Sequence, residues 1–248
     1  MKKTAITNIY PYLKGSYPIG MGTTSICYLM KDKRVLKVFL NTSGTYYLFT
    51  KFQNLIDHLE KVNSLKNNTY VVPEELLIKD GKLVAYIYDY VDSRTFKHIR
   101  LNTKIDTLLY GYDKLYEDTV DISNKGFCLY DLNDKNILFN GFYHIIDLDK
   151  GTFEGLMTKE NILKTNMKAI NNTLINSLFR VNDDELINFY NDDLKKSYTN
   201  NILKDYKGMK SFLKDIQKYE KNINKVSDLK FKTNSLRYTI YNDYYRHN

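Results

Sequence analysis

The segments 130–139 and 145–149 contain the residue types that most directly suggest chemistry. Asp131 and Asn136 stand five residues apart in a polar stretch, and Asp147 ends a short apolar run. Two carboxylates and an amide offer the hard oxygen atoms that Mg²⁺ prefers, with a triphosphate supplying further ligands. The pattern therefore favours a Mg²⁺ site at Asn136 and Asp147, and it leaves Asp131 to orient a hydroxyl nucleophile. A polar loop with Asx turns is the structural alternative.

Lys37 is a second candidate, because it stands between Leu36 and Val38 in an otherwise apolar segment. A lysine in such a place is costly to bury unless it has an anionic partner. A helix expected over residues 45–63 offers Glu60, which lies beside the apolar stripe, and Asp57 as the less favoured choice. The alternative is an edge-strand lysine that faces water.

Gly20 and Gly22 form a third candidate at the expected turn of a hairpin. Glycines at such a turn let backbone N–H groups approach a phosphate, because no Cβ stands in the way. The segment is neither a P-loop nor a dinucleotide-binding motif, since no Gly-Lys-Ser/Thr follows and the next element reads as a strand. Many Gly-x-Gly hairpins are turns without a ligand.

The elements that would carry these residues are strands in the first part of the chain. Short β-prone runs predict strands at 26–30, 34–40, 71–78 and 83–91, and Asp80-Gly81 favours a tight turn before the last of them. Apolar residues at three- and four-residue steps predict one helix over 45–63. Residues 92–94 interrupt the apolar pattern and are the expected linker.

The second part of the chain reads mainly as helix. The apolar pattern predicts helices over 104–123 and beyond residue 158, and Gly126 is suited to end the first of them. Between these helices, Asn140-Gly141 predicts a hairpin that joins residues 136–139 to 143–147.

Placed in chain order, these features resemble the protein kinase-like superfamily, which includes eukaryotic-type Ser/Thr kinases and relatives of aminoglycoside and choline kinases. Lys37 matches the strand lysine that contacts the nucleotide phosphates. Asp131-Leu132 and Asn136 match the catalytic loop, and Asp147 matches the metal-binding aspartate in an Ile-Asp-x-Asp form. Gly20 and Gly22 match the glycine-rich loop, and Ser25 stands where its third glycine usually falls.

The resemblance implies an α+β, two-lobed fold. The small lobe, residues 1–91, would be an antiparallel β-sheet with one helix, and the larger lobe, residues 92–248, would be mainly helical. ATP would bind with its adenine near the backbone of Asp89 and Val91. Lys37, held by Glu60, would position the phosphates, while Asn136 and Asp147 would hold Mg²⁺ and Asp131 would act on the acceptor.

The implied reaction is transfer of the γ-phosphoryl group of ATP to a hydroxyl acceptor, most closely as in Ser/Thr protein kinases. A small-molecule kinase is an alternative, favoured by the Ile-Asp-Leu-Asp form and by the short segment 150–159. An acidic group in the helical part would suit a cationic acceptor; its members are Asp183, Asp184, Glu185, Asp192 and Asp193.

Several positions depart from the family pattern. Leu129-Tyr130 replace the usual His-Arg before the catalytic aspartate, Asp149 replaces the glycine of Asp-Phe-Gly, and no Ala-Pro-Glu follows. These departures bear on peptide docking and regulation more than on phosphoryl transfer. They also leave a pseudokinase, a nucleotide-binding module without catalysis, as an alternative.

The composition indicates which partners and which cellular location to expect. The chain has 248 residues and a net charge of +8, and the whole basic excess lies beyond residue 194. This tail could meet an acidic partner, although nucleic acid ranks last because no recognition motif accompanies it. Two cysteines without metal-site spacing and the lack of an 18-residue apolar run predict a cytoplasmic protein without a transmembrane segment.

Overall fold

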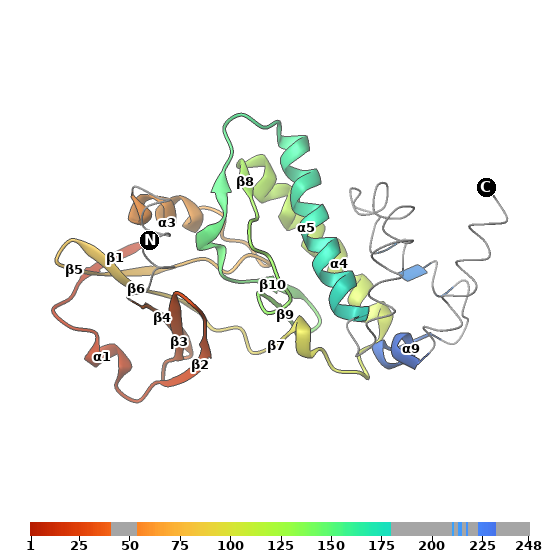
Figure 1. The fold of residues 1–248 in the computed structure, drawn as a ribbon, viewed down its shortest axis with the longest axis horizontal. Helices are drawn as coiled ribbons and strands as arrows, with labels where there is room; N and C mark the ends of the chain where they lie inside the picture. Colours follow the sequence, from red (N-terminus) through yellow and green to blue (C-terminus); the bar gives the residue numbers. More distant parts are fainter. Residues whose placement is uncertain (41–53, 180–209, 211–212, 215–216, 218–222, 232–248) are drawn as a thin grey trace. The chain divides into compact units, whose positions relative to one another are not determined.

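The computed structural model describes residues 1–40, 54–179, 210, 213–214, 217 and 223–231 (Figure 1). The chain has an α+β fold and divides into two compact units. The first contains Met1–Asp92 together with Ile145–Lys150, and the second contains Ser93–His144 and Gly151–Asn248. The predicted boundary lies between residues 91 and 92; the structure places the boundary after Asp92 and also assigns the distant segment Ile145–Lys150 to the first unit.

The first unit is built on a six-stranded sheet in the order β1-β5-β6-β4-β3-β2. Its strands are β1 (Lys2–Ala5), β2 (Tyr17–Met21), β3 (Ser25–Leu29), β4 (Arg34–Phe39), β5 (Glu75–Lys79) and β6 (Lys82–Asp89). Neighbouring strands of this sheet are antiparallel except β1 and β5, which are parallel. The predicted purely antiparallel sheet is therefore wrong. The first strand was missed because its Lys-Lys-Thr sequence gives an exposed edge no apolar alternation.

The predicted strands are confirmed, with bounds that are shifted or shortened. The strand expected from residue 71 begins only at Glu75, after Pro73, which has no N–H to donate to a neighbouring strand. Asp80 and Gly81 both have positive φ, as the predicted tight turn between β5 and β6 requires.

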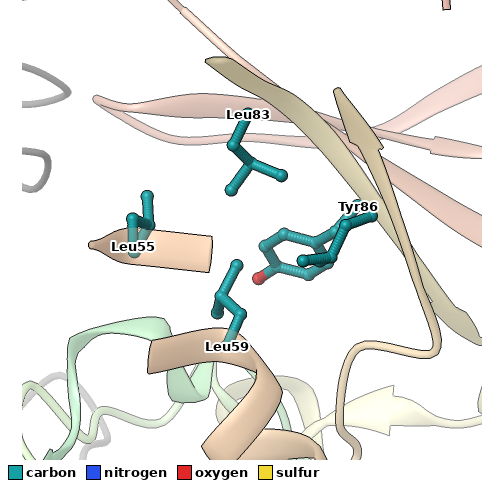
Figure 2. Close-up of a cluster of buried hydrophobic side chains, with 5 residues drawn as sticks. Leu55, Leu59, Leu83 and Tyr86 are labelled. Atoms are coloured by element: carbon teal, nitrogen blue, oxygen red, sulfur yellow. The ribbon is translucent and has the colours of Figure 1, made fainter. Parts of the chain in front are cut away.

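Helices cover both faces of this sheet. Helix α3 (Leu55–Asn63) packs its apolar stripe against one face, in a cluster made by Leu55, Leu59, Leu76, Leu83 and Tyr86 (Figure 2). On the other face, a cluster that includes Leu36 and Ile87 is covered by residues of and around the short helix α1 (Tyr10–Leu13). Since side chains alternate along a strand, Lys37 points to the face opposite Leu36, which is the face that α3 covers.

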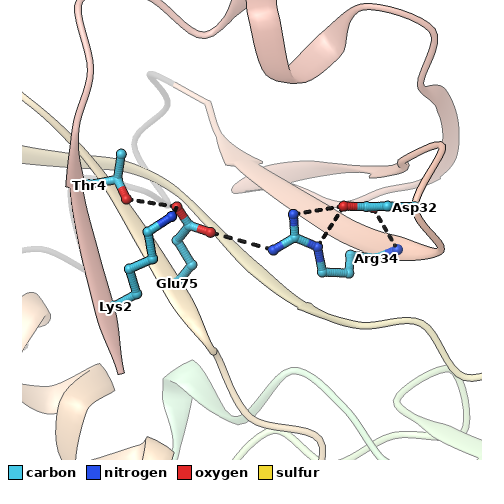
Figure 3. A network of polar contacts seen from close by, with 5 residues as sticks. All are labelled: Lys2, Thr4, Asp32, Arg34 and Glu75. Atoms are coloured by element: carbon cyan, nitrogen blue, oxygen red, sulfur yellow. Dashed lines mark hydrogen bonds and ion pairs between the residues drawn. The ribbon is translucent and has the colours of Figure 1, made fainter.

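A polar network links three strands of the sheet (Figure 3). The Glu75 carboxylate accepts hydrogen bonds from Lys2 Nζ at 2.8 Å, Thr4 Oγ1 at 2.7 Å and Arg34 Nη1 at 3.4 Å. Arg34 Nε also donates to Asp32 at 2.8 Å. Glu75 therefore joins β1 and β4 to β5.

The second unit is built around two long helices, α4 (Ile105–Asn124) and α5 (Lys159–Phe179), which pack together. Small sheets accompany them: β10-β9-β7 (Tyr143–Ile145, Ile137–Phe139, Arg94–Thr95) and β11-β8 (Thr152–Phe153, Phe127–Cys128). Short helices η1 (Phe96–His98) and α9 (Val226–Phe231) complete the described elements, together with η2 (Leu148–Lys150) of the first unit. Both long helices and the hairpin at Gly141 are confirmed predictions, and Gly126, with φ +82°, follows the end of α4.

Some predictions fall outside the described residues. These are residues 45–53 of the first predicted helix, the acidic group at 183–193, and most of the basic tail. Within the described residues, no helix combines the length and apolar character that a membrane crossing requires.

Candidate functional site

Lys37 forms the centre of the candidate site in the first unit. It lies in the middle of β4, paired with Cys27 of β3 and Tyr86 of β6, and only 4% of its surface is exposed. Its ammonium lies 2.6 Å from Asp149 Oδ2 and also contacts Asp147 Oδ1. The rings of Tyr86 and Phe39 lie 5.4 and 5.9 Å from the ammonium nitrogen, within cation–π range.

Both acids come from the short segment Ile145–Lys150. Ile145 anchors this segment to the first unit, because its N–H donates to Thr69 O at 2.7 Å and its carbonyl accepts from Val71 N at 3.0 Å. Asp147 follows with φ +66°, a left-handed conformation that non-glycine residues rarely adopt. Asp149 lies in η2, which packs near α3. Backbone conformation of this kind is often found at functional sites, where surrounding contacts hold it in place.

The surroundings of the two acids shift their pKa values in opposite directions. Burial raises the pKa of Asp149, and repulsion from Asp147 adds to this effect although Lys37 opposes it. Burial would also raise the pKa of Asp147, but the charge and hydrogen bond of Lys37 outweigh it and lower that pKa. For Lys37, burial favours a lower pKa, yet electrostatic interaction with its neighbours, chiefly the charges of Asp149 and Asp147, raises it well above its ordinary value. Lys37 is therefore charged, and Asp147 is the more readily ionised acid.

The predicted pairing of Lys37 with Glu60 is wrong. Glu60 lies on α3, but its carboxylate contacts Lys3 at 2.9 Å. The second choice, Asp57, accepts from Asn54 Nδ2 at the start of the same helix. Helical periodicity placed Glu60 next to the buried stripe, but it could not show that acids from a segment 110 residues away would reach Lys37 instead.

The glycine-containing hairpin lies between β2 and β3. Gly22 N donates to Ser25 O at 2.9 Å, and Ser25 is buried at the start of β3. Neither Gly20 nor Gly22 has positive φ, and a Cβ at Gly20 would meet nothing within 4 Å. A Cβ at Gly22 would meet only Ser25 O, at 3.9 Å. Within the described chain, neither backbone conformation nor packing requires glycine at these positions.

The positions proposed to meet adenine lie at and beyond the end of β6. The Asp89 carboxylate is exposed and lies 3.6 Å from Lys66 Nζ. Val91 is partly buried, and the intervening Tyr90 N donates to Lys33 O at 3.3 Å. The Tyr90 N–H bond is a backbone contact within this segment, and β6 ends at Asp89, before Val91.

Asp131 and Asn136 lie in one loop of the second unit. Asp131 has φ +59°, and its carbonyl accepts from Asn136 Nδ2 at 3.5 Å and from Asn133 Nδ2 at 3.2 Å. Asn136 N also donates to Asn133 O at 3.0 Å. In this loop Asp131 is exposed, and its backbone carbonyl is held by the asparagine at position 136.

Asn166 of α5 supports this loop, and it was not among the predicted site residues. Its Oδ1 accepts from Leu129 N at 2.8 Å, and its Nδ2 donates to Phe127 O at 2.8 Å and Ser123 Oγ at 3.0 Å. It is fully buried and so fixes the chain immediately before Asp131. An asparagine within an apolar helical stripe was the only sequence signal.

The described residues contain no group of three or more His, Cys, Asp or Glu side chains that could hold a metal ion alone. A magnesium–nucleotide complex needs less from the protein, because phosphate oxygens and water supply most of its ligands. Asp147 suits such a complex, since 29% of its side chain is exposed and its carboxylate is the more readily ionised of the pair.

No protein-family model matches the chain, and no curated protein has a sequence significantly similar to it. The function proposed below is therefore argued from the residues of the site.

Proposed function

We propose that the chain is an ATP- and Mg²⁺-dependent phosphotransferase with a two-lobed, protein kinase-like fold. One observation carries this proposal: a buried strand lysine, Lys37, is held by two aspartates of an Ile-Asp-Leu-Asp segment, in the same unit as a glycine-containing hairpin. A buried ammonium with an adjacent, partly exposed carboxylate is suited to the phosphates of a nucleotide and their metal ion.

In this proposal each side chain has a distinct task. Lys37 binds the nucleotide phosphates, and the backbone of Gly20 and Gly22 lies against them. Asp147 and Asn136 hold the metal ion, and Asp131 accepts the proton of the attacking hydroxyl. Bound Mg²⁺ neutralises phosphate charge, which is its main chemical contribution to such a reaction.

The glycines support a phosphate-binding role independently. Neither glycine is needed for conformation or packing. The open space beside them therefore suits a site where the phosphate group of a ligand closely approaches the protein backbone. The adenine would meet the main chain between Asp89 and Val91.

The acceptor is a hydroxyl group, and our first expectation is a Ser or Thr side chain. A small-molecule acceptor is the second candidate, and one observation favours it. Only residues 151–158 separate η2 from α5, and they include β11, so little chain is available there for docking a peptide.

Substitution of the two key aspartates tests the proposal in complementary ways. Asp131→Asn should leave ATP binding largely intact and lower turnover by about two orders of magnitude or more, because only the proton acceptor changes. Asp147→Ala should abolish the Mg²⁺-dependent part of ATP binding. Both are measured by calorimetric titration and by transfer from γ-labelled ATP to the protein itself or to metabolite fractions.

Asp106→Asn is the matched control, because this aspartate is exposed in the first turn of α4. It should alter neither binding nor turnover. Unchanged turnover in both site variants would exclude the phosphotransferase proposal. ATP binding by the unmodified protein without any labelled product would identify a nucleotide-binding module instead.

A further inference from the structure

The acids of the helix expected over residues 45–63 are the first candidates to hold Lys37. Residues 41–53 contain no Asp or Glu, so the only acids of the expected helix are Asp57 and Glu60. Both are engaged elsewhere, with Asn54 and with Lys3. The helix that covers the Lys37 face of the sheet therefore contributes no counter-charge to it.

The two acids that do contact Lys37 differ in their exposure to solvent. The Asp149 side chain is 1% exposed, and its Oδ2 lies 2.6 Å from Lys37 Nζ and accepts from the Tyr86 hydroxyl at 3.4 Å. The Asp147 side chain is 29% exposed. Asp149 is thus enclosed with the lysine and the tyrosine, whereas Asp147 presents part of its carboxylate to solvent.

We propose that Asp149 is the positioning residue for the Lys37 ammonium, and that Asp147 is thereby left available to a metal-bound phosphate. The role of Asp147 toward a metal-bound phosphate rests on the proposed function, whereas the pairing of Lys37 with Asp149 does not depend on it. The pair holds the ammonium against the sheet while Asp147 exchanges its lysine contact for the metal ion. Lys37 then stays in place without an acid from α3.

The structure of η2 explains why two acids can share this work. The two aspartates are separated by Leu148, which is buried, so η2 anchors its apolar side chain and points Asp149 inward. Asp147 precedes this turn with its left-handed backbone and stays nearer the surface. The spacing Asp-Leu-Asp thus provides one buried and one partly exposed carboxylate from adjacent backbone.

The test compares Asp149→Asn with Glu60→Gln in the full-length protein. The first measurement is the rate at which an amine-reactive ester labels Lys37, followed by mass spectrometry with the other lysines as internal references. Asp149→Asn should raise the Lys37 rate severalfold and leave the other rates unchanged, because only this ammonium loses its buried partner. Glu60→Gln should leave Lys37 labelling at the unmodified level.

The second measurement is the dissociation constant for MgATP. Asp149→Asn should raise it by about tenfold, in line with the loss of a charge-assisted hydrogen bond, whereas Glu60→Gln should not change it. A role in stability alone would lower the fraction of folded protein and leave the affinity of the folded molecules unchanged.

The two measurements separate the pair from the function. If the unmodified protein binds no nucleotide, the proposed function fails, yet the labelling rates still decide whether Asp149 holds Lys37. Equal Lys37 labelling in the unmodified protein and Asp149→Asn would overturn the inference, as would a response to Glu60→Gln instead. Should Asp149→Asn not fold, Tyr86→Phe replaces it. This variant should raise the rate of Lys37 labelling by a smaller factor, because it removes only the hydroxyl that contacts Asp149 Oδ2. An unchanged rate would again overturn the inference.

Discussion

At the scale of single residues, a lysine between two apolar neighbours must either reach water or meet an opposite charge. Lys37 meets two, because Asp147 and Asp149 both approach its ammonium. Cation–π contact with Tyr86 adds to this environment without adding charge. The chemistry of the site therefore follows from how a single buried positive charge is shared between two acids.

The glycines of the hairpin give a prediction that separates a ligand role from a structural one. Gly20→Ala should leave the free energy of unfolding nearly unchanged, because an added Cβ meets open space and φ is not positive. It should nevertheless raise the MgATP dissociation constant, since the methyl group would stand between backbone and phosphate. Chemical denaturation and nucleotide titration measure the two effects.

Gly81→Ala is the matched control in the same unit. Gly81 has φ +73°, so alanine there should cost about 1 kcal/mol of stability while ATP affinity stays the same. Equal nucleotide affinities in Gly20→Ala and the unmodified protein would show that the hairpin does not meet phosphate.

The candidate residues could be predicted from sequence to different degrees. Lys37 stood out because a charge among apolar residues needs a partner, and Asp147 stood out as a candidate Mg²⁺ ligand; the structure brings their side chains together, a pairing that was not predicted. The choice of Glu60 was wrong because periodicity tells which face of a helix a residue occupies but not which distant segment comes closest. Asp149 was noted only as a departure from the family pattern, since burial of its carboxylate depends on the position of η2 in the folded chain.

At the scale of elements, local sequence patterns predicted the turns and helices that depend on residues close together in the chain. The tight turn at Asp80-Gly81 and the long helices α4 and α5 depend on sequence within a few residues, and they are confirmed. The pairing of β1 with β5 depends on residues more than 70 positions apart and on an exposed edge, so no local pattern indicates it. The mixed sheet was therefore missed.

The Glu75 side chain adds contacts with β1 and β4 to the backbone pairing of the sheet, and it gives a pH-dependent prediction. Burial alone would raise the pKa of Glu75, but hydrogen bonds from Lys2 and Thr4 and the charges of Lys2 and Arg34 lower it below 4.5. A lowered pKa in the folded state means that the ionised form stabilises the fold. This contribution is present above pH 4.5 and is lost as the pH falls through the folded-state pKa.

Glu75→Gln should therefore lower the free energy of unfolding by about 1–3 kcal/mol at neutral pH, and the difference from the unmodified protein should shrink in acid. Urea denaturation between neutral and acid pH measures this. Glu74→Gln, which removes a more exposed carboxylate that contacts Lys66, is the control and should have a smaller effect. A difference that grows in acid would contradict the assignment of Glu75 as an ionised anchor.

At the scale of the whole molecule, the first unit is completed by a segment that the chain reaches only after passing through part of the second. Ile145–Lys150 supplies both acids of the Lys37 cluster and also bonds to the backbone at Thr69 and Val71. Neither domain boundaries read from a linker nor local periodicity can reveal such a return. The site is thus a property of the complete chain, because its charges come from residues 110 and 112 positions apart.

This long-range dependence predicts that the stability effects of single and combined substitutions are not additive. Lys37→Met should lower the free energy of unfolding by about 3 kcal/mol, because it leaves Asp147 and Asp149 without their counter-charge in a buried place. Adding Asp147→Asn and Asp149→Asn should restore most of that loss, since no unpaired charge then remains. Urea denaturation of the single and triple variants measures this coupling.

Substituting the exposed pair Lys164 and Glu160 in the same way should show little coupling, because water screens charges at the surface. Losses that simply add in the Lys37 series would mean that the three charges do not stabilise one another, and the proposed arrangement of the site would then be incorrect.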